Sequence, residues 1–324
     1  MPLIDPSILD CALYVYPSEG AAQQGVSAGG SGFLVGIPAP LADWWHIYAV
    51  TNKHVLDGGH HVLRINTKNG GFDTITTTPD AWTTLPDDDV AVLPLEVADK
   101  FHVNFIPAEM FMPEHNQGTK ELGIGDDAVL IGRLITHEGR QRNKPIARFG
   151  SIAMLADADE PIRISEDKAQ VGYLIDCRSL SGASGSAVLG FRVPHRGNMM
   201  MIGASLPVLL GIDCAHLPFW TPVCEKRDRR AALPDMWAES NSGIAVVVPA
   251  WRIQAALDQG HLVDERRRED EQIVRDHGTS VTEPTVDPSD SNPSNRSAES
   301  PASDSATRRS LGGEGGEGKG QEKG

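Results

Sequence analysis

Three short segments of this 324-residue chain carry side chains that could act together in acyl transfer. In the first, an apolar run ends in a short polar turn that presents His54. In the second, Asp89 stands directly before an apolar run. In the third, Ser184 lies in a turn bracketed by Gly182 and Gly185 that leads into another apolar run. A base, a carboxylate and a hydroxyl are the three groups that this chemistry requires.

Each of the three groups has a separate task. A serine hydroxyl is a poor nucleophile at neutral pH, so a neighbouring base must take its proton during attack. Histidine suits that task because its unperturbed pKa lies near 6.5. A buried carboxylate fixes the imidazole tautomer and stabilises the imidazolium that forms. Since the order His, Asp, Ser is one of the known chain orders of this triad, the sequence predicts His54, Asp89 and Ser184 as the catalytic residues.

The glycines around the predicted nucleophile indicate an oxyanion-binding turn. Gly182 and Gly185 allow a tight backbone turn in which main-chain N–H groups point at one place. The loss of one such donor typically costs about 100- to 1000-fold in rate. We expect the N–H groups of Gly182 and Ser184 to form the pair. Ser181 and Ser186 compete with Ser184, which alone has glycine at both the −2 and +1 positions.

Other acidic and histidine side chains lie near the predicted carboxylate and base. Asp87 and Asp88 compete with Asp89, which is preferred because it directly adjoins the apolar run. His60 and His61 follow a Gly-Gly turn beyond the predicted base, and we expect them to face solvent.

The composition excludes several classes of partner. A hydrophobic content of 40% fits a soluble globular protein, and a net charge of −15 disfavours nucleic acid and anionic lipid. No stretch approaches the roughly 20 apolar residues that span a bilayer. The N-terminus has no basic region followed by an apolar one. We therefore expect a cytoplasmic protein that binds neither nucleic acid nor membrane.

No motif predicts a cofactor or a metal. The glycine-rich stretch Gly29–Gly32 lacks the following lysine and helix-forming run of a phosphate-binding loop. The four cysteines are too few and too scattered to indicate a disulfide framework. Cys214, His216 and Cys224 do not have the spacing of a zinc site.

Short β-rich runs recur between turn signals, which is typical of an all-β sandwich or barrel. The runs are Cys11–Tyr16, Gly32–Ile37, Trp45–Thr51, His61–Asn66, Val90–Leu95, Ala128–Ile135, Ile146–Met154, Val171–Asp176, Ala187–Phe191, Met199–Ser205, Val208–Ile212 and Ile244–Pro249. One helix, Ala250–Leu257, follows them because Trp251, Ile253 and Leu257 can share a buried side.

The composition changes sharply after Leu262. From Val263 onward the chain is polar, first rich in Glu and Arg, then in Ser, Pro and Asp, and finally in Gly, Glu and Lys. Such a segment cannot bury enough apolar surface to offset its ordering entropy. We expect a folded domain over residues 1–262 and a disordered polar tail over 263–324, in which alternating Glu and Arg could continue a helix for two turns.

The motifs, taken in order, resemble the trypsin-like serine peptidases of the chymotrypsin clan, especially the bacterial HtrA-type catalytic domain. The matching segments are Gly30–Val35, Val50–Val55, Asp89–Leu93, Gly182–Ala187, Leu210–Ile212 and Gly243–Pro249. The resemblance implies two six-stranded antiparallel β-barrels, a cleft between them that holds the active site, and a closing C-terminal helix. It also implies a serine endopeptidase that works through an acyl-enzyme intermediate on protein or peptide substrates.

The departures from the family pattern are informative. In animal trypsin-like enzymes an aspartate before the serine pairs with a freshly cut N-terminus, whereas this chain has the uncharged Ala183. We therefore expect activity without N-terminal processing. Ser186 replaces the usual second glycine, and no sequence typical of a regulatory PDZ domain follows the helix.

The resemblance places the primary specificity pocket between two stretches, Ile175–Ser181 and Gly211–His216. Their charged residues disagree in sign, because Asp213 favours a basic side chain whereas Arg178 or His216 favours an acidic one. The sequence therefore predicts no cleavage preference, and it predicts no oligomeric state.

The segment from Leu217 to Ser242 is long for a connection inside a compact domain. One interpretation is a surface insertion whose aromatic side chains pack on the barrel. The other is a lid or substrate-contact loop in which Trp220 and Trp237 supply apolar contact area. Two alternative functions also remain, a catalytically silent adaptor with the same fold and an acyl hydrolase such as an esterase.

Overall fold

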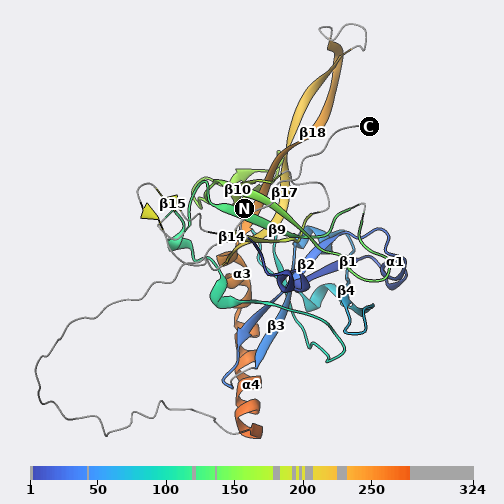
Figure 1. Ribbon diagram of the computed structural model, residues 1–324, viewed down its shortest axis with the longest axis vertical. Coiled ribbons are helices and arrows are strands. Elements are labelled where there is room, and N and C mark those ends of the chain that lie inside the picture. Colours follow the sequence, from blue (N-terminus) through green and yellow to red (C-terminus); the bar gives the residue numbers. More distant parts are fainter. Residues whose placement is uncertain are drawn as a thin grey trace, which may run out of the picture. The chain divides into compact units, whose positions relative to one another are not determined.

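The computed structural model describes residues 3–41, 44–118, 122–135, 137–177, 183–191, 195–196, 199–200, 207–224 and 232–277. Strands dominate these residues and form two large sheets, one from each half of the chain (Figure 1). The prediction of an all-β fold is confirmed.

The first half of the chain forms an eight-stranded sheet. Its strands are β1 (Ala12–Tyr16), β2 (Gly30–Pro38), β3 (Trp45–Thr51), β4 (Val62–Asn66), β5 (Phe72–Thr76), β6 (Thr83–Thr84), β7 (Ala91–Pro94) and β8 (Ile106–Pro107). They pair in the order β5-β4-β1-β2-β3-β7-β6, and β8 lies parallel to β2. In the described part of the chain the edge strands β5 and β6 do not pair, and β6 has only two residues with which to close the sheet.

The second half forms the closed barrel that the family resemblance implies. Its six strands pair in the order β10-β13-β18-β17-β14-β9. Their bounds are β9 (Asp127–Gly132), β10 (Ile146–Met154), β13 (Tyr173–Asp176), β14 (Ala187–Phe191), β17 (Val208–Cys224) and β18 (Ala232–Pro249). Two small hairpins accompany it, β11 (Ile162–Arg163) with β12 (Ala169–Gln170), and β15 (His195–Arg196) with β16 (Met199–Met200).

A shared apolar core joins the sheet to the barrel. Phe33 and Val50 from the sheet pack in one cluster with Ile131 and Val248 from the barrel. Residues next to them on the sheet strands, such as Leu34, belong to a separate cluster on the other face of the sheet. This two-sided burial explains why β2 and β3 are almost continuously apolar rather than alternating.

Helices are few, and all of them except α4 are short. The α-helices are α1 (Glu19–Gln24), α2 (Lys53–Asp57), α3 (Ala250–Leu257) and α4 (Gly260–His277), and the 3-10 helices are η1 (Pro6–Cys11), η2 (Pro79–Ala81), η3 (Ala108–Met110) and η4 (Glu114–Asn116). Helix α3 has the predicted bounds. In the part of the chain that the structure describes, no helix combines the length and the apolar character that crossing a bilayer requires.

Helix α4 extends the ordered structure beyond the predicted domain end at Leu262. Arg266 donates hydrogen bonds to the Tyr48 hydroxyl and to the Leu257 carbonyl, both at 2.9 Å. Polar contacts with the sheet therefore hold a helix whose own sequence has little apolar surface. The rest of the predicted tail, residues 278–324, lies outside the described residues.

The long connection between Leu217 and Ser242 is a hairpin rather than an irregular loop. Strands β17 and β18 continue beyond the barrel and pair with each other, for example Trp220 with Glu239 and Pro222 with Trp237 (Figure 1). Trp220 and Trp237 are 54% and 61% exposed, so the interpretation in which these aromatic side chains pack on the barrel is wrong. Pairing between the two backbones supports the hairpin, and the neighbouring side chains of Phe219 and Trp220 are both exposed.

Candidate active site

His54 lies on the short helix α2, which follows strand β3. Helices leave their first backbone N–H groups without intrahelical partners. Here the Asp89 carboxylate supplies one from another part of the chain, because the His54 N–H donates to Asp89 Oδ1 at 3.0 Å. The preceding Asn52 donates its side-chain N–H to the Asp89 carbonyl at 2.7 Å. Helix α2 is therefore tied to Asp89 through its backbone.

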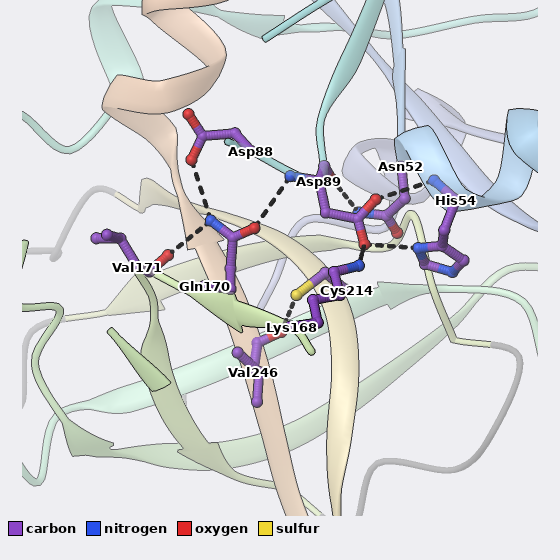
Figure 2. A network of polar contacts seen from close by, with 9 residues as sticks. All are labelled: Asn52, His54, Asp88, Asp89, Lys168, Gln170, Val171, Cys214 and Val246. Atoms are coloured by element: carbon purple, nitrogen blue, oxygen red, sulfur yellow. Dashed lines mark hydrogen bonds and ion pairs between the residues drawn. The ribbon is translucent and has the colours of Figure 1, made fainter. Parts of the chain in front are cut away.

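The same carboxylate also contacts the imidazole ring. His54 Nδ1 lies 2.7 Å from Asp89 Oδ2, as Figure 2 shows. The carboxylate is 2% exposed, whereas the ring is 40% exposed. Burial alone raises the pKa of Asp89, but the hydrogen bonds and charge of His54 and the hydrogen bond from Lys168 outweigh it and lower the pKa to about 2. Asp89 is therefore ionised at neutral pH and orients a ring that reaches solvent.

A hairpin from the barrel half reaches the same carboxylate. Lys168, just before β12, places Nζ 2.8 Å from Asp89 Oδ2 (Figure 2). On β12, Gln170 accepts a hydrogen bond from the Asp89 N–H at 3.0 Å and donates one to Asp88 Oδ1 at 3.0 Å. The role of Lys168 and Gln170 beside Asp89 was not predicted from the sequence, because the only local signal at these residues is a polar turn.

The carboxylates that compete with Asp89 have other surroundings. Asp88 is buried, and it contacts Gln170 and, at 3.7 Å, the Arg252 guanidinium of α3. Asp87 is exposed. Among the three aspartates, Asp89 is the one that bonds the His54 ring in the described part of the chain.

Ser184 lies in a turn before β14 that packs on the start of β2. Its carbonyl accepts a hydrogen bond from the Ser31 N–H at 2.7 Å. Gly185 has a φ of 85°, and a Cβ there would lie 1.8 Å from the Ser31 carbonyl oxygen, so only glycine fits. Ser186 is fully buried and donates its hydroxyl to the Ala183 carbonyl at 2.5 Å. Ser184 is half-buried, and Ser181 lies outside the described residues.

The serine turn and helix α2 meet at Gly30. A Cβ on Gly30 would lie 2.8 Å from Val55 Cγ2 and 2.9 Å from the Ser184 carbonyl oxygen. Val55 follows His54 on the helix, so the two predicted catalytic side chains belong to segments that touch the same point of β2. Among the residues that the structure describes, no hydrogen bond links Ser184 Oγ to His54 Nε2, and such bonds often tighten only when substrate binds.

One of the two predicted oxyanion donors can be described. The Gly185 N–H donates to the Asp213 carbonyl at 2.9 Å and the Ser186 N–H to the Ala183 carbonyl at 3.0 Å. The Ser184 N–H has no partner within the described ranges. Gly182 lies outside them.

The predicted pocket residues divide into two groups. Asp213 lies beside the serine turn, because its N–H donates to the Ser186 carbonyl at 2.9 Å. Its side chain is buried, and Oδ1 has no hydrogen-bond partner among the described residues. Burial raises the pKa of Asp213 to about 8, although the charge of Arg148 opposes this. His216 is half-buried on the same strand, beyond a bulge. Arg178 lies outside the described residues.

A cleft of about 330 Å³ opens beside the His54–Asp89 pair. It is lined by Lys53, His54, Asp57, Pro86, Asp87, Asp88, Asp89, Asp167, Lys168, Ala169 and Gln170. In the described residues, no group of three or more His, Cys, Asp or Glu side chains has a geometry that could hold a metal ion. The cleft therefore holds an imidazole and an ionised carboxylate, and Ser184 is not among its lining residues.

No protein-family model matches this sequence, and no curated protein matches it. Solved protease structures are similar to it at low identity. The MamO protease domain from Magnetospirillum magneticum, in its apo form, is 15% identical with a TM-score of 0.46, and the match covers 78% of this chain and 99% of that one. The active form of the Rv3671c protease from M. tuberculosis is 17% identical with a TM-score of 0.39, covering 79% and 89%.

Catalytically active tobacco etch virus protease, complexed with product, is 11% identical with a TM-score of 0.41, covering 81% of this chain and 82% of that one.

Proposed function

We propose that this chain is a serine endopeptidase in which Ser184 is the nucleophile, His54 the general base and Asp89 the carboxylate that orients it. The observation that carries the proposal is the double contact of Asp89 with His54, at the ring nitrogen and at the backbone N–H. It leaves Nε2 as the ring atom that can exchange a proton with a nucleophile. The packing of both the serine turn and helix α2 against Gly30 supports the choice of Ser184.

The reaction follows from these roles. Ser184 Oγ attacks the carbonyl carbon of the scissile peptide bond while His54 Nε2 accepts the hydroxyl proton. The imidazolium then donates that proton to the leaving amine as the C–N bond breaks, which leaves an acyl-enzyme. Water repeats the sequence, giving its proton to His54 and releasing the acid and the free serine. Asp89 keeps its charge throughout and stabilises the imidazolium.

The oxyanion of each tetrahedral intermediate requires hydrogen-bond donors. The Ser184 N–H, which has no partner in the described part of the chain, supports its assignment to this task. We assign the second donor to Gly182 from the sequence motif. Since Ala183 is buried among apolar side chains and carries no charge, the site needs no ion pair with a cut N-terminus.

A fluorophosphonate probe tests the proposal without a known substrate. The full-length chain should react at one serine, Ser184→Ala should not react, and Ser186→Ala should serve as a matched control for the turn. A folded chain that does not react would instead support the catalytically silent adaptor. Profiling a peptide library against an ester panel then separates peptidase from esterase, because an esterase would turn over esters and leave every peptide intact.

A further inference from the structure

The Asp89 carboxylate bonds two side-chain nitrogens, one from His54 and one from Lys168. Oδ2 lies 2.7 Å from His54 Nδ1 and 2.8 Å from Lys168 Nζ. Because both nitrogens bond the same oxygen, the distance between them cannot exceed the sum of these two distances. The lysine side chain is 44% exposed, and the carboxylate is 2% exposed. Figure 2 shows the lysine approaching the carboxylate from the barrel side, beside Cys214.

A second positive charge at this distance opposes the protonation of the imidazole. The lysine side chain is 44% exposed, so solvent screens this repulsion in part but does not remove it. The Lys168 ammonium also donates a hydrogen bond to Asp89 Oδ2, the same oxygen that would stabilise the imidazolium. Removing the lysine charge should therefore slow the reaction selectively at the acid end of its pH range.

Among the described residues, the other charged groups near His54 do not bond the Asp89 carboxylate as Lys168 does. Lys53 and Asp57 belong to its own helix, and Asp87, Asp88 and Asp167 line the cleft. On the barrel, Cys214 lies near Asp89, but burial, followed by the charges of Asp89 and Asp213, raises the pKa of this thiol, so it stays neutral. In the described residues, Lys168 is the cation that bonds the carboxylate shared with His54.

We propose that Lys168 is a positioning residue that shares the Asp89 carboxylate with His54 and extends catalysis to lower pH. It acts through Asp89 and does not touch the reacting atoms. Its hairpin is fastened independently by Gln170, which bonds the Asp89 N–H and Asp88. Removal of the lysine charge should therefore leave the hairpin in place.

The test measures the rate of inactivation by a fluorophosphonate against pH for the full chain. In Lys168→Gln the midpoint of the acid limb should move up by about 0.5–1 pH unit, which corresponds to a roughly three- to tenfold slower reaction well below the midpoint. The rate on the alkaline plateau should stay within about twofold or rise. Lys168→Arg keeps the charge and should restore the wild-type profile.

Lys100→Gln is the matched control, because this lysine pairs with Asp73 on the edge strand β5, at the opposite edge of the sheet from β7. It changes the net charge equally and should leave the profile unchanged. NMR titration of the His54 ring signals, assigned with His54→Ala, should show the same upward shift in Lys168→Gln.

The outcomes separate this inference from the function on which it rests. A wild-type chain that never reacts contradicts the proposed function, while the NMR titration still tests the lysine. A reactive wild type with an unshifted Lys168→Gln profile overturns the role of Lys168. A lower plateau with an unshifted midpoint would show that the lysine only anchors the hairpin.

Discussion

Two histidines near the two ends of strand β3 are paired with carboxylates in opposite ways. His54, after the strand, has a 40% exposed ring on a carboxylate that is 2% exposed. His46, near its start, has a 7% exposed ring between Glu269 and Asp270 of α4, which are 56% and 33% exposed. Each ring nitrogen of His46 lies 2.8 Å from a carboxylate oxygen.

Under the proposed function, this difference separates a reactive pair from a structural one. Both ring nitrogens of His46 contact carboxylates of α4, so both are used to fasten this helix to the sheet. His54 uses Nδ1 alone, and in the described residues its Nε2 makes no hydrogen bond. A buried carboxylate with an exposed ring keeps one nitrogen available for chemistry, whereas a buried ring between exposed carboxylates does not.

The largest expected effect comes from removing the groups at the reactive pair. Ser184→Ala and His54→Ala should each lower peptidase activity by about 10⁴-fold or more, because members of such a unit act together. His46→Ala is the matched control and should retain most of the wild-type rate. Cleavage of a substrate found by library profiling measures the effect. Undiminished activity in Ser184→Ala would refute the assignment.

Asp89 and Asp270, the carboxylates bonded to the two histidines, should also differ widely in their effect on the reaction rate. Asp89→Asn should lower the rate by about 10²- to 10⁴-fold, because the amide can hold the wrong imidazole tautomer and does not stabilise the imidazolium. Asp270→Asn, with the same change at the other histidine, should leave the rate within about twofold. Steady-state kinetics of the two variants check this. Equal losses would show that the two pairs are not functionally distinct.

The structural pair should affect stability instead of rate. His46→Leu removes two charge-assisted hydrogen bonds, so it should destabilise the protein by about 2 kcal/mol and lower Tm by about 4–8 °C. His102→Leu is a control, since this exposed histidine pairs with Asp10 at 3.1 Å and should change Tm little. Thermal unfolding by circular dichroism measures both. A stability unchanged in His46→Leu would mean that α4 is not held by this contact.

Asp213 extends the comparison, because it is a buried carboxylate whose Oδ1 has no hydrogen-bond partner in the described part of the chain. The pKa of Asp213 is raised to about 8, mainly by burial, so the folded state keeps a proton that the unfolded chain loses above pH about 4. Its contribution to stability is full below pH about 4 and is lost as pH rises to about 8.

Asp213→Asn cannot ionise, so its Tm advantage over wild type should grow steadily across this window. Each pH unit corresponds to about 1.4 kcal/mol, or a Tm change of about 3–6 °C. Asp99→Asn, at an exposed position, should show no such trend. Melting curves between pH 4 and pH 9 test this prediction. A Tm difference between Asp213→Asn and wild type that does not change with pH would contradict the raised pKa of Asp213.

Local patterns predicted the apolar elements closely. Strands β3, β10 and β14 and helix α3 have the predicted bounds, because each is a run of β-branched and apolar residues, or an amphipathic stretch, between clear turn signals. The sheet of the first half and the closed barrel of the second lie within the all-β prediction. The bonded pair of His54 and Asp89 was also predicted, since their types and chain order alone indicate it.

The polar elements required the tertiary structure. Helix α4 and the β17–β18 hairpin have few buried side chains, so burial patterns could not predict them. The helix is held by contacts of Arg266, Glu269 and Asp270 with the sheet, and the hairpin is held by pairing between its two strands.

The sequence by itself determined which segments are buried strands and predicted that His54 and Asp89 pair, because hydrophobic periodicity and side-chain chemistry are local properties. It did not determine what surrounds Asp89. Lys168 lies 79 positions further along the chain and bonds that carboxylate only because the hairpin of one half docks on the other. Such long-range polar contacts depend on how the two halves pack, and no local pattern of residues encodes that packing.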